Sequence, residues 1–149
     1  MAISGDVMRD NRDALRELAM QQCITAIRDS GEFLTADNLA KFLLVDSNKL
    51  RKQLTDWKGR GEIFSVQDAA EGELFPVFAF DNSHGLQLFE AIPRVLEVFR
   101  DRLSAWGIAG WFVAASSYLD DQLPKDLLRE DPDWVVEAAL DWMGEVSHG

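Results

Sequence analysis

The segment LTADNLAKFLLVDSNKLRKQLTDWKGRGEIFSV, residues 34–66, decides the predicted fold. It contains two short runs, and each begins at a residue type that caps helices, Thr35 in the first and Asp46 in the second. Both runs carry apolar residues at helical spacing on one face: Leu39, Ala40 and Leu43, then Leu50, Leu54 and Trp57. A tight turn at Leu44-Val45 joins them. We therefore predict a helix-turn-helix whose second helix covers residues 47–58.

The outward face of that second helix carries residue types that bind DNA. Asn and Arg side chains can read base edges, and Lys neutralises phosphates. Residues 49–60 contain five bases and one acid, Asp56. The residues predicted to contact DNA are Ser47, Asn48, Lys49, Arg51, Lys52, Thr55, Lys58 and Arg60. The alternative is a solvated helix face in a scaffold that does not bind DNA.

The apolar period changes to two after Gly61, which predicts a β-hairpin. Its strands are expected at residues 62–66 and 74–80, joined by the polar segment 67–73. A hairpin directly after the second helix predicts the wing of a winged helix. Pro76 has no N–H to donate, so its strand is expected at a sheet edge or at a bulge. The acids Asp68, Glu71 and Glu73 near the tip would repel phosphate, so this wing is not expected to enter a DNA groove.

A long helix is predicted over residues 7–30 and ended by Gly31. One stripe of it is apolar or small: Leu15, Leu18, Ala19, Gln22, Cys23, Ala26 and Ile27. This stripe can pack on its own domain or on the same helix of a second copy, and the sequence leaves both open. A homodimer is the expected assembly. Cys23 is the one cysteine of the chain, which excludes an internal disulfide; it is expected to pack in the helix.

The segment from residue 105 to residue 144 holds four of the five tryptophans and many acids. Short helices are predicted over residues 105–116, from Pro124, and over residues 132–143, after a helix over 92–103. Asp131 is expected to cap the last helix and Gly144 to end it. At least two of these tryptophans are expected in the core, and Trp134 is the best candidate for exposure. The segment is predicted to dock a protein partner.

Charge is divided unevenly along the chain. Residues 1–61 carry ten Lys/Arg and nine Asp/Glu, whereas residues 62–149 carry five and seventeen, which together give the net charge of −11. Such a chain is not expected to bind nucleic acid generally, because phosphate contacts dominate that affinity. The division allows a DNA-facing N-terminal half and an acidic half that docks a partner; the alternative is that the acids only keep the surface soluble. No apolar run reaches membrane-spanning length, and a cytoplasmic protein is expected.

Motifs of catalysis and of cofactor binding are missing from the sequence. It has no phosphate-binding glycine loop, no nucleophile elbow and no paired metal-binding histidines, since His84 and His148 stand alone. The acid pairs Asp120-Asp121 and Glu130-Asp131 are typical of turns and helix caps. We expect neither an enzyme nor a bound cofactor or metal.

The expected fold class is mainly α. Residues 1–81 are predicted to form an N-terminal helix and a winged helix-turn-helix with a small antiparallel β-hairpin. Residues 82–149 are predicted to form a C-terminal helical bundle that binds a partner. One domain, or two small units that share a core, fits the length of 149 residues.

Four segments, in order, resemble a known family over about two thirds of the chain. The first is the helix-turn-helix ending in GEIFSV, residues 61–66; the second, LFPVFAFD at 74–81, is similar to the family's strand of the form YPxFQFD. The third is Trp106 followed by Trp111-Phe112 and Leu119; the fourth, LPKDLL at 123–128, is similar to P-x-(D/E)-L-L. The chain thus resembles the Xre/MbcA/ParS-type toxin-binding family, antitoxin partners of RES-domain toxins, in its winged-helix-fronted members. Ala79 and Asp120-Asp121 depart from the family pattern, where a Gln and a Gly-containing turn are usual.

The resemblance implies an antitoxin-like regulator in a toxin-antitoxin system. Its C-terminal helices would grip a RES-type toxin, and its N-terminal part would bind operator DNA and repress its own promoter. RES toxins are similar to NAD-consuming enzymes, so NAD chemistry would belong to the partner. The residues expected to bind the toxin are Trp111, Asp120, Asp121, Lys125, Asp126 and Trp134. The alternatives are a stand-alone winged-helix transcription regulator whose C-terminal helices only dimerise, and an adaptor protein that does not bind DNA.

Overall fold

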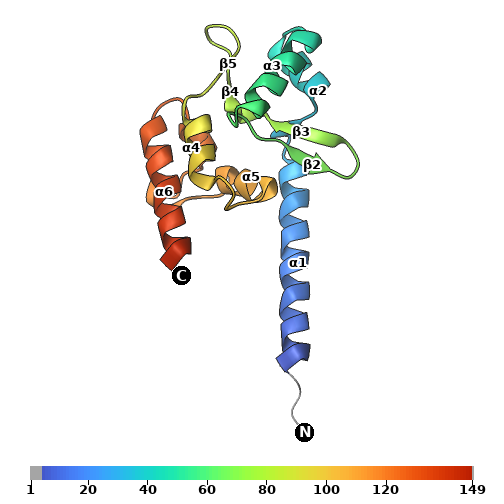
Figure 1. Cartoon of the computed structure of the whole chain (residues 1–149), viewed down its shortest axis with the longest axis vertical. Helices are drawn as coiled ribbons and strands as arrows, with labels where there is room; N and C mark the ends of the chain where they lie inside the picture. The colour runs from blue at the N-terminus through green and yellow to red at the C-terminus, as the bar shows by residue number, and fades with distance from the viewer. Residues whose placement is uncertain (1–4, 149) are drawn as a thin grey trace.

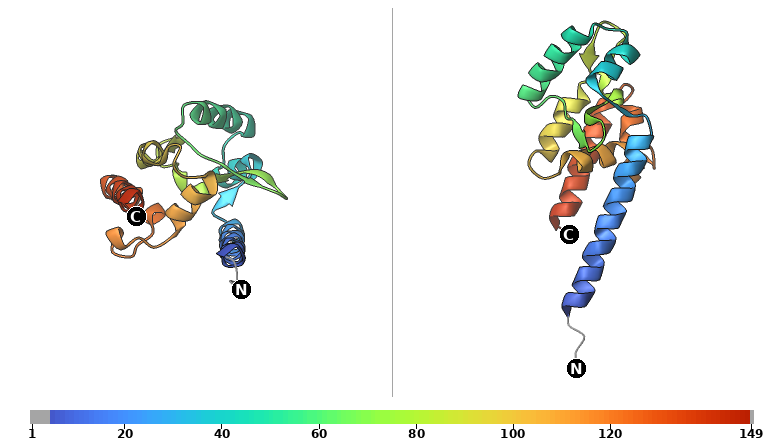
Figure 2. Two further views of the ribbon diagram at one scale, coloured as in Figure 1. Left: turned by 60° about the horizontal axis from the view of Figure 1, so that its bottom comes forward. Right: turned by 90° about the vertical axis from the view of Figure 1, so that its right-hand side faces the viewer.

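The computed structural model of the chain describes residues 5–148 and the side chains of residues 11–144. The described part is mainly helical, with a small antiparallel sheet, as the sequence predicts. Helix α1 (Gly5–Asp29) projects from the body of the molecule, and the other helices gather around the strands at its C-terminal end (Figure 1). The two further views show the same separation of α1 from the body (Figure 2).

The two helices of the predicted helix-turn-helix are confirmed as α2 (Ala36–Leu43) and α3 (Ser47–Gly59). The Thr35 hydroxyl accepts a hydrogen bond from the Asn38 amide at 3.2 Å, and the Asp46 carboxylate accepts one from the Lys49 amide at 2.9 Å. Between the helices Leu44 adopts a left-handed conformation with φ of 58°. All six predicted inward residues are buried. Local capping and the apolar stripe therefore determine this part of the fold.

The predicted antiparallel hairpin is present as β2 and β3, but its strands have other bounds than predicted. A three-stranded antiparallel sheet has the order β1-β3-β2, with β1 at Phe33–Leu34, β2 at Val66–Asp68 and β3 at Gly72–Pro76. Residues 62–65 are not a strand, and residues 77–79 form the 3₁₀ turn η1 (Val77–Ala79). β4 (Phe80–Asp81) pairs with β5 (Gln87–Leu88) in a second small sheet. The β2–β3 turn is tight because the Asp68 carboxylate accepts hydrogen bonds from the amides of Ala70 and Glu71.

Of the two positions predicted for Pro76, an edge strand or a bulge, the edge strand is not observed, because β3 is the middle strand of its sheet. Pro76 pairs with Phe33, and the neighbouring Val77 amide donates to the Glu32 carbonyl at 2.8 Å. Since hydrogen-bonded and non-hydrogen-bonded pairs alternate in an antiparallel ladder, Pro76 occupies a position that needs no donor toward β1. On its other side the β2 pairing has already ended at Val66.

The C-terminal half consists of short elements around two packed helices, α4 (Ala91–Phe99) and α6 (Pro132–His148), which lie side by side (Figures 1 and 2). Between them come α5 (Ala105–Val113) and the 3₁₀ turns η2 (Ser117–Leu119) and η3 (Pro124–Leu127). Asp131 caps α6 as predicted, through its carbonyl to the Val135 amide and its carboxylate to the Trp134 amide. Gly144 does not end α6, because it lacks the positive φ of a helix-ending glycine and the helix continues to His148.

Buried residues from both halves of the chain form one continuous core. Aromatic rings join them: Phe112 of α5 stacks on Phe64 at 6.0 Å between ring centroids and lies 5.2 Å from Phe78. Phe99 of α4 packs edge-on against Trp111 and Trp142 at 5.1 and 5.7 Å. The predicted boundary between residues 1–81 and residues 82–149 therefore does not separate two cores.

The predicted stripe of α1 does not pack on its own chain over most of its length. Of its seven residues only Ile27 is buried, and Cys23 is exposed, so the expectation that Cys23 packs is wrong in the single chain. The reason is geometric: only the last turns of α1 reach the body, where they contact α5.

Candidate functional site

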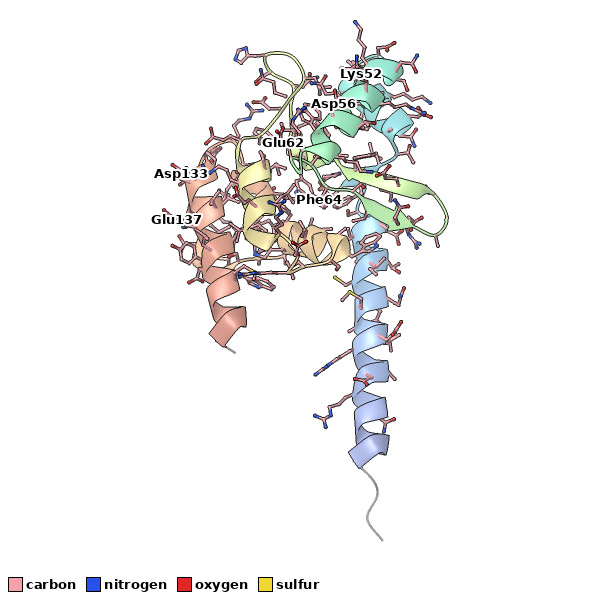
Figure 3. The ribbon with its side chains drawn as sticks, viewed as in Figure 1. Lys52, Asp56, Glu62, Phe64, Asp133 and Glu137 are labelled. Atoms are coloured by element: carbon pink, nitrogen blue, oxygen red, sulfur yellow. The ribbon has the colours of Figure 1, made fainter. Side chains whose placement is uncertain are left out.

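The outer crest of α3 is the candidate nucleic-acid interface. Leu50, Leu54 and Trp57 bury the opposite side of the helix, which leaves Asn48, Lys49, Lys52 and Thr55 exposed. Figure 3 shows Lys52 and Asp56 on α3, at the end of the molecule far from the N-terminal end of α1. Lys49 and Lys52 form no ion pair with any residue whose side chain the structure describes. These two lysines are the free positive charges of the crest.

The other three bases of residues 49–60 are held by carboxylates. Arg51 pairs with Asp37, Lys58 pairs with Glu73, and Arg60 Nε lies 2.9 Å from a Glu62 carboxylate oxygen. Asp37 also accepts a hydrogen bond from the Ser47 hydroxyl at 2.9 Å. With Asp56 included, five bases face four carboxylates here, a net charge of one. The predicted basic track is therefore largely neutralised within the chain.

The paired carboxylates stay ionised because their partners stabilise the charge. Hydrogen bonds from Arg51 and then Ser47 lower the pKa of Asp37. Partial burial works to raise the pKa of Glu73, but hydrogen bonds from Lys58 and Ser65 outweigh it and lower the pKa. Arg51 and Lys58 border a groove of about 460 Å³ between α3 and the sheet, with Leu54 and Phe75 among its lining residues. A DNA phosphate would have to compete with both carboxylates for these cations.

The structure separates the six predicted partner-binding residues. Trp111 is only 9% exposed and packs against Phe99 and Phe112, so the expectation that its ring faces a partner is wrong. Lys125 is largely buried, with Nζ 3.2 Å from Glu32 and 3.1 Å from Asp126, which contradicts its expected role at a surface. Burial works to lower the pKa of Lys125, but hydrogen bonds to Asp126 and Glu32 raise it. Lys125 thus ties η3 to the residue before β1.

Asp120 and Asp121 do lie at the surface. Both have positive φ, 57° and 66°, in a turn where the Asp121 amide donates to the Ser116 carbonyl at 2.8 Å. Asp126 is exposed but paired with Lys125. Trp134 is half-buried against the core, as are Trp106 and Trp142, so its expected exposure is not observed. Of the six residues predicted to bind a partner, Asp120 and Asp121 are therefore the two that are exposed and not paired with another described side chain.

Sequence reasoning missed several large apolar residues that are exposed. Tyr118, 40% exposed, precedes the acidic turn and lines a cavity of about 320 Å³ between α5, η2 and α6. Asp141 of α6 lines the same cavity. Phe42 and Leu44 are exposed at the end of α2, Leu44 at 90%. A one-turn 3₁₀ segment such as η2 has no stripe from which exposure could be predicted.

Asp81 joins the two halves of the chain by hydrogen bonds. Its carboxylate accepts from the Ser83 amide at 3.1 Å, the Ser83 hydroxyl at 2.6 Å and the Arg129 guanidinium at 3.0 Å. The same guanidinium lies over the Phe89 ring, 5.0 Å from its centroid. The hydrogen bonds from the Ser83 side chain and amide, and then from Arg129, lower the pKa of Asp81 to about 2.

This lowered pKa predicts a defined loss of stability in acid. A carboxylate whose pKa is lower in the folded protein stabilises it above the unfolded pKa, and this stabilisation is lost as the pH falls from about 4 to about 2. Asp81→Asn is therefore expected to lower Tm at pH 6 and to converge with wild type near pH 2. Tm measured from pH 2 to pH 6 checks this, with Asp141→Asn as the control; parallel curves for Asp81→Asn and wild type would contradict it.

No group of three His, Cys, Asp or Glu side chains that could hold a metal ion occurs among the residues that the structure describes. His84 lies exposed in the loop before β5, and the side chain of His148 lies outside the described set. Within residues 5–148 there is no helix long and apolar enough to cross a membrane. Comparison with protein-family models, with curated proteins and with solved structures finds no match.

Proposed function

We propose that this protein is a DNA-binding regulator of the winged-helix type whose acidic C-terminal half docks a protein partner. The observation that carries the proposal is the position of α3. The order α1-β1-α2-α3-β2-β3, with β1 paired to β3, leaves the α3 crest uncovered at one end of the molecule (Figure 1). A second helix of a helix-turn-helix enters the major groove in this manner.

The chemistry of the crest supports direct contact with DNA. Asn48 is a residue type that reads adenine edges. Lys49 and Lys52, which pair with no carboxylate among the described side chains, can neutralise phosphates. The β2–β3 turn carries Glu71, and Asp68 is bound to Arg28 and to the turn amides, so the hairpin offers no cation to a groove. In this proposal α3 alone makes the contacts to bases.

A variant pair tests the DNA-binding half. Lys49→Ala/Lys52→Ala is expected to abolish binding to a fragment from upstream of the protein's own coding sequence, because it removes both free charges of the crest. Arg100→Ala/Arg102→Ala removes the same charge from the acidic half, where neither arginine is ion-paired with a described residue, and is expected to bind like wild type. Fluorescence anisotropy measures both. Equal losses in the two variants would reduce the effect to net charge and contradict the assignment to α3.

The proposed partner is a basic protein. The resemblance of the sequence to antitoxins suggests that this partner is a RES-type toxin. The surface would comprise the exposed acidic turn at Asp120-Asp121, the neighbouring Tyr118 and the outer side of α6 with Glu137 (Figure 3). Asp133 of the same helix is paired with Arg94 at 2.7 Å. Complementary charge accelerates encounter, and an aromatic side chain can anchor the contact. Co-expression with the product of the neighbouring gene tests this half. Relief of toxicity and a stable complex are expected. The absence of both would contradict the proposal that the C-terminal half docks this partner.

One observation favours the alternative of an adaptor that does not bind DNA, namely the ion pairs that hold Arg51, Lys58 and Arg60. An adaptor would bind its protein partner and would show no DNA affinity in the anisotropy experiment. Either function is that of a binding protein, and neither requires catalysis by this chain.

A further inference from the structure

Most side chains of α1 that the structure describes pack on no other described part of the chain. Every side chain from residue 11 to residue 23 is exposed, including Leu15 at 65% and Leu18 at 55%. Figures 1 and 2 show these turns projecting from the body. Packing of one face supplies most of the stability of a helix in a protein, and an apolar face in water lacks it. The bare stripe therefore needs something to cover it.

The C-terminal end of the same stripe forms one wall of a largely apolar groove, which Glu32 and Lys125 also line. Cys23, Ala26 and Ile27 face Gly110, Val113 and Ala114 of the α5 region, with Leu123 beyond, around a cavity of about 430 Å³. The stripe thus has an N-terminal end that projects from the body and carries two leucines, and a C-terminal end beside α5 that carries small residues. Large side chains at one end and small side chains beside a groove at the other allow the two ends to pack on each other.

We propose that a second copy of this chain covers the stripe, with the two α1 helices antiparallel. A two-fold axis near residues 20 and 21 places Leu15 of each copy level with Ala26 of the other, and Leu18 level with Cys23. Each large residue then meets a small one and fills the groove of the other copy, and the contact is the same in both directions, as an isologous dimer requires.

The charges of α1 suit a copy of itself. Residues 11–29 carry three bases and three acids, although the whole chain has a net charge of −11. In the antiparallel register Arg12 lies level with Asp29 of the other copy and Arg16 lies level with Thr25, so no like charges meet. A strongly basic or strongly acidic partner would gain nothing from this balanced helix, whereas a copy is matched to it.

The expected dimer is weak. The paired segment, residues 12–29, is about 27 Å long, and such a contact is smaller than the roughly 800 Å² per partner of a standard interface. We expect dissociation in the micromolar range, and because the helix is stabilised by its partner, helix content should rise with concentration. This inference is independent of DNA binding and of the toxin, since its tests need neither.

Cross-linking tests the register. Leu18→Cys places a new thiol opposite the native Cys23 of the other copy, so mild oxidation is expected to give a covalent dimer. Wild type and Leu18→Cys/Cys23→Ser each carry a single thiol per copy and are expected to stay uncross-linked. In this register a residue at position 18 or 23 lies five residues from the same residue of the other copy, about 7.5 Å along the helix. That separation is beyond the reach of a disulfide. Leu140→Cys, which places the thiol at an exposed position of α6, is the matched control and should stay monomeric. No dimer for Leu18→Cys, or equal dimer in all variants, would overturn the register.

Sedimentation equilibrium tests the dimer itself, in the full chain without DNA. Leu15→Asp is expected to raise the dissociation constant at least tenfold, and Leu140→Asp is expected to leave it unchanged. Both replace an exposed leucine, so neither should prevent folding of the core. A wild-type chain that stays monomeric up to about 200 µM, or a dimer that survives Leu15→Asp, would overturn the proposal.

Discussion

Replacement of Phe112 by alanine is expected to lower the free energy of unfolding by about 3–5 kcal/mol. Phe112 is fully buried, stacks on Phe64 and contacts Phe78 and Trp111. The substitution removes a ring at the junction between the residues that follow α3 and the C-terminal helices. The surrounding backbone belongs to several elements and cannot collapse into the space, so both the lost burial and the cavity contribute.

Urea unfolding followed by tryptophan fluorescence and by far-UV circular dichroism measures this effect. Because Phe112 belongs to the one core that both halves share, the two signals should shift together. Phe42→Ala is the matched control, since its ring is exposed, and it should change stability by less than about 0.5 kcal/mol. A loss below about 1 kcal/mol for Phe112→Ala, or two separate transitions, would contradict a shared core.

Removal of the carboxylates that hold Arg51 and Lys58 is expected to strengthen DNA binding, if α3 is the interface proposed above. Asp37→Asn/Glu73→Gln frees both bases and raises the local net charge by two. Each freed base that reaches a phosphate should add about 0.9 to the magnitude of the salt slope, about threefold in affinity over a fourfold change of salt. The double variant should therefore bind several-fold more tightly at low salt than wild type.

The control for this prediction is Asp126→Asn, which removes a carboxylate paired with Lys125, far from α3 in the sequence. It raises the net charge without freeing a base on the crest. If Asp126→Asn strengthened binding as much as the double variant, the gain would reflect net charge alone. Circular dichroism should confirm that Glu73→Gln, which also loses a hydrogen bond from Ser65, remains folded.

Local sequence signals predicted the helices of this fold well and its strands poorly. The caps Thr35, Asp46 and Asp131 act within three or four residues, so the sequence shows them directly. By contrast, β1 and β5 are two residues long, too short to show an alternating pattern, and β1 pairs with residues 75 and 76, far along the chain. The alternating pattern of residues 74–80 continues through Pro76, but the chain turns there into η1 because β1 ends at the same level.

The sequence predicted which residue types lie on the outer face of α3, but it did not predict which of them are already held in ion pairs. A helical projection identified the outward face of α3 but could not show that Asp37 and Glu73, 14 and 15 residues from their partners, return to neutralise it. Trp111 was misassigned because α5 is apolar on all sides, with only alanine, glycine and hydrophobic residues, so no stripe distinguishes core from surface. Lys125 was misassigned because its partner Glu32 precedes it by most of the chain.

The dependence of DNA affinity on salt for the wild-type protein tests the proposed function most directly. With Lys49 and Lys52 as the free cations of the crest, the logarithm of the association constant should fall linearly with the logarithm of salt concentration, with a slope of about −2 per bound chain. A fragment from upstream of the coding sequence, titrated between about 50 and 200 mM salt, gives that slope. Absent binding, or weak binding that does not change with salt, would contradict the assignment of α3 as a DNA-binding helix.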